Sequence, residues 1–261
     1  MNRRYGPNIR ASIGAKTILV FALVLSTLAV TATPSPSPSP HPLTAFSGMA
    51  ALNLNAVAAT KSAVVTGHVH FAHRGAFTRV DVIDLSAVAS AGGHNVAMPL
   101  PFEGLHFVVD GARGTFAVWS SRSPRYYSGR LKTNRSAFQV ANVTSALSPL
   151  TQFSLLSISL NLIGDQTSNG HPVSAFEFEA KTRKRGAATA TDVTGHVDLG
   201  DDVSGFPIHA DATITSGSAA KVTIAMDVTA LSASAPPLSA FAPPKGYKRT
   251  GHIADVLSAH P

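Results

Sequence analysis

The sequence predicts a mainly β, α+β fold: one strongly curved antiparallel sheet with helical material against its apolar side. Segments that alternate apolar and polar residues recur between residues 62 and 231, as expected for strands with one buried face. The turns between these segments are short, which favours antiparallel neighbours. A sheet of this length must curve, pair with a second sheet or be covered, because otherwise a large apolar face would meet water.

Two β-hairpins are predicted in the first half of the chain. One joins Ser62–Phe71 to Ala76–Leu85 through a turn at His73–Gly75, and both runs carry apolar residues on one side. The other joins Gly104–Asp110 to Gly114–Ser121, and an Asp-Gly pair marks its turn. Arg125–Arg130 is predicted to continue this part of the sheet. Further along the chain, alternation in four successive segments predicts an antiparallel meander: Val173–Thr182, Ala188–Gly200, Phe206–Thr215 and Ala220–Leu231.

The pattern changes between Ala141 and Ile163. Ser148-Pro149 is typical of a helix N-cap followed by proline at the first helical position. We therefore predict a helix from about Pro149 to Leu162, ending before Gly164. The part from Leu155 to Ile163 also alternates, so a strand is the alternative there. A helix that is apolar over most of its circumference needs a covering sheet or ligand.

The N-terminus has the pattern of a secretory signal peptide. Residues 1–16 are basic, Ile18–Val30 is an apolar run, and Val30-Thr31-Ala32 is a small–x–small cleavage site. The run is short for a spanning helix, which needs about 20 apolar residues, although an uncleaved anchor is the alternative. We expect a signal peptide at residues 1–32, a Pro/Ser linker at 33–42, a single half-barrel domain at 43–251 and a tail at 252–261.

Composition limits the function classes. The formal net charge is +7, but four of the cations lie in the first 32 residues and most later ones are scattered, so no nucleic-acid partner is expected. Cysteine is absent, which excludes disulfides and a lipid-modified N-terminal cysteine. The basic turn Lys181–Gly186 could touch anionic lipid heads, although a solvated hairpin tip is the simpler interpretation.

Catalytic motifs are missing from the chain. It has no G-x-S-x-G elbow, P-loop, dinucleotide glycine fingerprint or H-E-x-x-H pattern. We therefore expect no enzyme and no cofactor. A metal site is a weaker hypothesis: His68, His70 and His73 lie close in sequence, and Asp81 on the next strand could complete a ligand set. An exposed strand face that happens to carry histidines is the simpler explanation.

The order of segments resembles the bacterial outer-membrane lipoprotein carrier (LolA-like) family and its relatives over roughly Ser62–Arg249. The residues that carry this resemblance are Phe77, Arg79, Asp110, Gly111, Trp119, Pro124, Gly205-Phe206-Pro207, Phe241, Pro244, Gly246 and Tyr247. The family's first amphipathic helix is poorly matched by Leu43–Ser62, and the linker is foreign to it. The resemblance implies an unclosed β-barrel wrapped around helices, with a cavity for acyl chains. It also implies that Phe241 and Tyr247 lie across the open side, whereas a tail packed on the sheet is the alternative.

We accordingly predict an exported, non-catalytic, monomeric envelope protein that holds an acyl chain or similar apolar ligand in its half-barrel. It would be periplasmic, envelope-bound or extracellular, with a membrane surface or an envelope protein as a further partner. The competing hypothesis is an interaction module whose core is completely filled. The predicted cavity wall and helical lid comprise Val80, Val82, Phe153, Leu155, Leu156, Phe176, Phe178, Ile208, Ile224 and Met226.

Overall fold

A computed structural model describes residues 42–59, 61–97, 104–130, 153–184, 190–216 and 220–257. The predicted signal peptide, nearly all of the Pro/Ser linker and residues 149–152 of the predicted helix lie outside these ranges. Among the residues within them, no helix is long and apolar enough to cross a bilayer.

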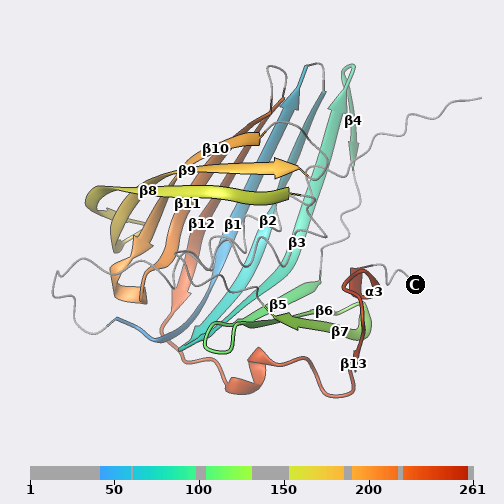
Figure 1. Cartoon of the computed structure of the whole chain (residues 1–261), viewed down its shortest axis with the longest axis vertical. Helices are drawn as coiled ribbons and strands as arrows, with labels where there is room; N and C mark the ends of the chain where they lie inside the picture. The colour runs from blue at the N-terminus through green and yellow to red at the C-terminus, as the bar shows by residue number, and fades with distance from the viewer. Residues whose placement is uncertain are drawn as a thin grey trace, which may run out of the picture.

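Thirteen strands in the described ranges form a single sheet with the order β13-β7-β6-β5-β3-β2-β1-β12-β11-β10-β9-β8, and β4 pairs with β3 off this path (Figure 1). Only β13 and β7 pair in parallel; the other described strand pairs are antiparallel. The strands are β1 Ala45–Ala58, β2 Lys61–Arg74, β3 Phe77–Ala91, β4 His94–Ala97, β5 Leu105–Asp110, β6 Thr115–Ser120, β7 Ser123–Arg130, β8 Phe153–Ser168, β9 His171–Lys184, β10 Ala190–Gly200, β11 Phe206–Ser216, β12 Ala220–Ser232 and β13 Lys248–Arg249.

Both predicted hairpins and the meander are confirmed. Strands β2 and β3 pair from Arg74–Phe77 outward, and β5 pairs with β6 along its whole length. The meander β9-β10-β11-β12 follows chain order in the sheet. Alternation predicted the meander strands because each has one face in the core and one face toward solvent, whereas β5 and β6 bury residues on both faces.

The helix predicted from Pro149 to Leu162 is wrong where the structure describes it. Residues 153–162 belong to strand β8, which was the alternative interpretation, so Phe153, Leu155 and Leu156 do not form a helical lid. Strand β8 pairs with β9 through a turn at Asn169-Gly170, where both residues have positive φ, of 49° and 83°. Asn-Gly is the preferred pair for such a hairpin turn, and it commits the preceding residues to a strand.

The poorly patterned segment Leu43–Ser62 contains the strand that holds the sheet together. Strand β1 pairs with β2 on one side and with β12 on the other, so it joins the N-terminal hairpins to the C-terminal meander. Its core-facing positions include Phe46, Ala50, Leu52 and Leu54, all of them buried. Because β1 pairs with a strand on each side, it is a central strand of the sheet, and its alternating residues place one face in the core.

The sheet curls strongly, so that β8 and β9 lie nearly crosswise to β2 and β3 (Figure 1). One ring contact shows this curvature. Phe71 of β2 stacks on Phe206 of β11, and the ring centroids are 4.6 Å apart. These strands are three positions apart in the sheet order, which in a flat sheet would separate them by about 14 Å. The predicted fold class, a strongly curved, unclosed antiparallel sheet, is confirmed.

The C-terminal segment packs on the face of the sheet opposite the main core. It comprises the 3₁₀ helix η2 (Leu238–Phe241), β13 and the short helix α3 (Ala254–Leu257). Phe241 joins Ala72, Val108 and Trp119 in a separate apolar cluster, with Tyr247 packed against it. The ending therefore does not lie across an open side of the barrel; it is the tail packed on the sheet.

Candidate functional site

The curved sheet has one continuous apolar face. A single buried cluster takes residues from β1, β2, β3, β9, β10, β11 and β12. In the paired register, one row crosses six adjacent strands in the order Leu52, Met226, Ala210, Val197, Phe176 and Leu162. A second row runs parallel to it through Leu54, Ile224, Ala212, Gly195, Phe178 and Leu160.

Burial along the first row falls toward strand β8. Ala210 and Val197 are fully buried, and Phe176 is partly buried. Leu162 at the end of the row keeps 57% of its surface exposed. Because β8 is the last of the described strands on this side of the sheet, the apolar face reaches solvent at Leu162.

Most of the predicted ligand-binding residues lie together on this face. Val80, Val82, Phe178, Ile208, Ile224 and Met226 are in the buried cluster, and Phe176 packs against it. Phe153, Leu155 and Leu156 are in strand β8, and their side chains lie outside the described part of the structure. The proximity of the seven placed residues makes the site geometrically coherent; ligand binding by them remains a prediction.

Large side chains lie flat along this face where glycine occurs on the neighbouring strand. A Cβ atom on Gly195 would stand 2.6 Å from Cζ of Phe178, and one on Gly48 would stand 2.5 Å from Cζ of Phe71. Only a residue without a side chain permits these rings to cover the adjacent strand so closely. The rings therefore form a low lining over the sheet.

The opposite face of the same strands carries histidines and carboxylates. The predicted metal trio does not converge there. The Nδ1 atom of His68 lies 3.1 Å from Asp84 Oδ1, and that of His70 lies 3.5 Å from Asp81 Oδ2. His73 is buried on the apolar side, where its ring stacks on Phe46 at 5.0 Å. Successive residues of a strand point to opposite faces. His73 follows His70 by three residues, so it lies on the face opposite His68 and His70.

A buried polar network surrounds Asp81 on this face. Its carboxylate lies 2.7 Å from both Arg79 Nε and His106 Nδ1. Arg79 also donates a hydrogen bond to the carbonyl of Ala240 and lies over the Trp119 ring, 5.5 Å from its centroid. Burial by itself would raise the pKa of Asp81, but hydrogen bonds from His106, His70 and Arg79 and the Arg79 charge hold that pKa well below its ordinary value. The network thus fastens the C-terminal segment to β3.

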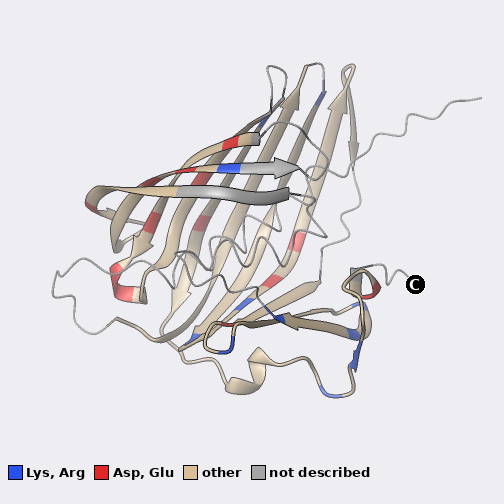
Figure 2. Ribbon diagram, in the orientation of Figure 1, with Lys and Arg blue, Asp and Glu red and all other residues tan. Residues whose placement is uncertain are grey.

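A second group lies around His209 on β11. Its Nδ1 atom is 2.6 Å from Asp227 Oδ1, and its Nε2 atom is 3.5 Å from Asp211 Oδ2. Burial works to lower the pKa of His209, but the carboxylates of Asp227, Asp211 and Asp198 outweigh it and the pKa is raised. Figure 2 shows acidic residues along the middle of several strands of the large part of the sheet, whereas Lys and Arg gather around β5–β7 and β13.

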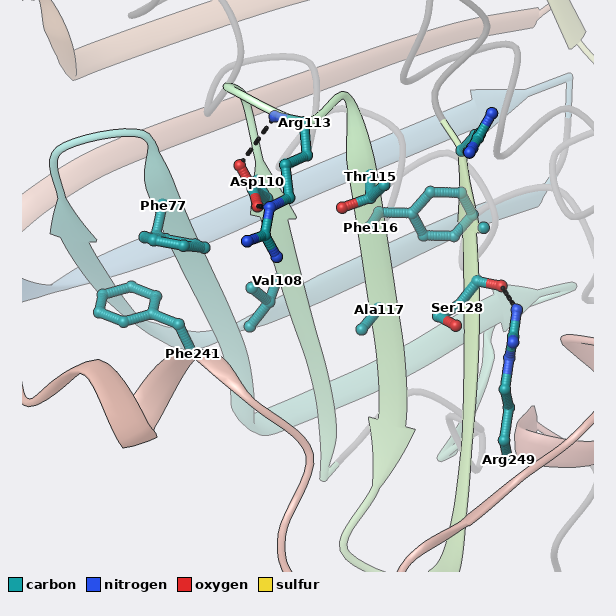
Figure 3. Close-up of a pocket in the computed structure, with 12 residues that line it drawn as sticks. Phe77, Val108, Asp110, Arg113, Thr115, Phe116, Ala117, Ser128, Phe241 and Arg249 are labelled. Carbon is teal, nitrogen blue, oxygen red and sulfur yellow. Dashed lines mark hydrogen bonds and ion pairs between the residues drawn. The ribbon is translucent and has the colours of Figure 1, made fainter.

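Two open depressions can be described among the placed residues outside the apolar core. One, of about 430 Å³, lies between the C-terminal segment and β3, β5, β6 and β7, where Phe77 faces Phe241 (Figure 3). Arg113, Arg130 and Arg249 also line it. The other, of about 490 Å³, lies on the polar side over Gly67, between His68, Asp84 and Asp227. Neither coincides with the predicted cavity wall.

Sequence analysis missed the groups on the polar face that combine residues from separate strands. Asp81 was considered only as a metal ligand, and His196, His209 and Asp211 were not singled out. Alternating His-x-Asp in His196–Asp198 and His209–Asp211 was a visible signal, because this spacing puts both side chains on one face of a strand.

Comparisons with known proteins find similar solved structures and no family. No family model matches the chain, and no curated protein matches it. Among solved structures, it is similar to lipovitellin (9% identity, TM-score 0.41), covering 77% of this chain but only 26% of lipovitellin. It is also similar to the Mycobacterium tuberculosis lipoprotein LppX (12% identity, TM-score 0.24, covering 69% of this chain and 85% of LppX). A LolA superfamily protein from Nitrosomonas europaea is similar at 8% identity and TM-score 0.27, over 85% of this chain and 96% of that protein. At these identities and scores, functional inference depends on this chain's own residues.

Proposed function

We propose that this protein is an exported, non-catalytic binding protein that holds an acyl chain or another apolar group against the apolar face of its curved sheet. The observation that carries the proposal is the row from Leu52 to Leu162, which crosses six strands without a polar side chain and ends at an open edge. A linear apolar ligand could enter beside the exposed Leu162. Because Ala210 and Val197 are fully buried in this structure, its extension along the row requires displacement of the groups that cover them.

The energetics favour a long ligand. Each buried CH₂ group contributes about 0.8 kcal/mol, less the free energy of ordering the chain. The residues of the proposed wall are Val80, Val82, Phe176, Phe178, Ile208, Ile224 and Met226. Strand β8, which contains Phe153, Leu155 and Leu156, forms the border of the proposed site. An N-terminal signal peptide would deliver the domain to an envelope or extracellular compartment, where free apolar groups need a carrier or a sensor.

The first test is native mass spectrometry of the chain expressed with its own N-terminal segment and recovered from the exported fraction. We expect a co-purifying lipid whose mass is lost on delipidation. Recovery of ligand-free protein, together with failure of the delipidated protein to bind cis-parinaric acid, would reject the proposal. That result would favour the interaction module with a completely filled core.

A matched pair of variants tests the location of the site. Leu162→Asp places a charge at the open end of the apolar row, whereas Val64→Asp places one at a similarly exposed position on the polar face. We expect Leu162→Asp to weaken cis-parinaric acid binding about tenfold or more, because a carboxylate must be desolvated beside the acyl chain. Val64→Asp should leave the affinity unchanged. Equal effects of the two variants would contradict a site on the apolar face.

A further inference from the structure

Three side chains converge on the polar face of β10 and β11. His196, His209 and Asp211 each offer a ligand atom, and these atoms lie within 4.8 Å of one another. His196 is directly opposite Asp211 in the register, and His209 lies two residues before Asp211 on the same strand. The antiparallel pairing therefore places all three on one face.

His209 is already oriented as a metal ligand would be. Asp227 on β12 lies 2.6 Å from its Nδ1 atom, which leaves Nε2 directed toward Asp211. A carboxylate that holds one imidazole nitrogen while the other meets a cation is the usual outer arrangement of metal-binding histidines. The Nε2 to Asp211 Oδ2 distance is 3.5 Å, close to the ~3.3 Å between two ligands bonded at ~2.0 Å to a tetrahedral ion.

His196 has its own carboxylate support. Its Nε2 atom lies 3.1 Å from Oδ1 of Asp198, and Asp198 is only 3% exposed. That same oxygen accepts a hydrogen bond from Gln166 Nε2 at 2.9 Å, so the carboxylate is held from β8. The rings of His196 and His209 are 5.9 Å apart between centroids. His209 is thus positioned by a carboxylate from the neighbouring strand β12, and His196 by a carboxylate two residues along its own strand.

The group is accessible from solvent and negatively charged. The side chains of His196, His209 and Asp211 are 27%, 26% and 50% exposed. Carboxylate oxygens of Asp198, Asp211 and Asp227 lie 3.1, 3.5 and 2.6 Å from the ring nitrogens of the two histidines. An incoming cation would therefore find imidazole and carboxylate groups in an electronegative setting.

We propose that His196, His209 and Asp211 form a binding site for a divalent transition-metal cation, with Zn²⁺ as the best match. Two imidazoles and one carboxylate are a ligand set that Zn²⁺ accepts in tetrahedral geometry with a fourth position open to water. Mg²⁺ and Ca²⁺ are bound by oxygen ligands, so the two histidines select against them. The site is on the face opposite the apolar row and does not depend on acyl binding.

Isothermal titration of ZnCl₂ into the full chain, prepared without a polyhistidine tag, tests the site. We expect saturable binding of one Zn²⁺, with no comparable heat from MgCl₂. His209→Ala and Asp211→Asn should each weaken Zn²⁺ binding by at least about tenfold, and Asp227→Asn by about 10- to 100-fold. His68→Ala is the matched control, because His68 is an exposed histidine paired with one carboxylate, and it should bind Zn²⁺ as the parent does.

Two further measurements distinguish loss of the metal site from loss of the fold. Circular dichroism checks each variant, and Asp211→Asn, at a half-exposed position, should retain the fold even if His209→Ala does not. Co²⁺ added to the parent should give the visible absorption of a tetrahedral complex, and Asp211→Asn should diminish it. Unchanged Zn²⁺ affinity in the doubly substituted His196→Ala, His209→Ala protein would overturn the proposal, as would equal binding of Zn²⁺ and Mg²⁺ by the parent.

Discussion

The two faces of strand β11 have different chemistry although their residues alternate one by one. Ile208, Ala210 and Ala212 are buried in the main core, whereas the side chains of His209 and Asp211 on the other face are 26% and 50% exposed. The apolar face obtains its stability from area removed from water. The polar face depends on a few directed contacts between strands. Substitutions should therefore act through different physical terms on the two faces.

The largest effect is expected on the apolar face. Ile208→Ala removes a side chain that is fully buried at the centre of the core, and it should lower the free energy of unfolding by about 2–5 kcal/mol. Urea unfolding of the full chain measures this change. The matched control is Ile83→Ala at a position that is 47% exposed, which should stay within about 0.5 kcal/mol of the parent. Similar losses for the two variants would contradict a single buried core on one face.

Asp81→Asn should show the next largest effect, and it tests the polar face. Loss of the charge leaves the mostly buried Arg79 without its carboxylate, so we expect a loss of about 2–3 kcal/mol at neutral pH. The control is Asp84→Asn, since Asp84 forms an exposed pair with His68 and should contribute little.

The same substitution should change the pH dependence of stability. The pKa of Asp81 is lowered in the folded state, so its contribution is present above its ordinary pKa of 3.8 and is lost as the pH falls toward the folded-state value. Urea unfolding between about pH 5 and pH 2 should thus show a steeper loss for the parent than for Asp81→Asn. Parallel pH profiles would show that the carboxylate is not specifically stabilised in the folded protein.

A smaller loss of stability is expected for Gly195→Ala, which tests how closely Phe178 packs on the neighbouring strand. Gly195→Ala introduces a Cβ atom 2.1 Å from the Asp211 carbonyl oxygen and 2.6 Å from Phe178 Cζ, which should destabilise the fold by about 1–3 kcal/mol through overpacking. Gly251→Ala is the control, because no atom lies within 4 Å of a Cβ there and its φ is not positive. If thermal unfolding showed no loss for Gly195→Ala, the ring of Phe178 would not lie flat on β10.

Strand positions were predictable from the sequence where alternation was clear, as in the meander from β9 to β12. The error at β8 has a local cause. Ser148-Pro149 suggested a helix start, and the apolar density of Leu155–Ile163 suits a helix or a strand. Asn169-Gly170 was the deciding signal, since this pair favours a two-residue hairpin turn and binds β8 to β9.

The candidate apolar wall was also predictable, because alternation alone assigns Val80, Phe178 and Ile208 to one face of their strands. The polar sites were not predictable in the same way. Asp81 and His106 are 25 residues apart, and Arg79 meets a carbonyl 161 residues away. Such contacts require the strand order and the path of the C-terminal segment, which periodicity does not provide.

The sequence by itself determined which side chains share a face, since a strand turns successive residues to opposite sides. Only the tertiary structure decided which strands meet: β1 lies between β2 and β12, and the curvature brings Phe71 onto Phe206. The register that places His196 opposite Asp211 is likewise tertiary. Its physical reason is that pairing partners and bulges, such as that between Asp198 and Leu199, are selected by packing of the whole sheet rather than by any one strand.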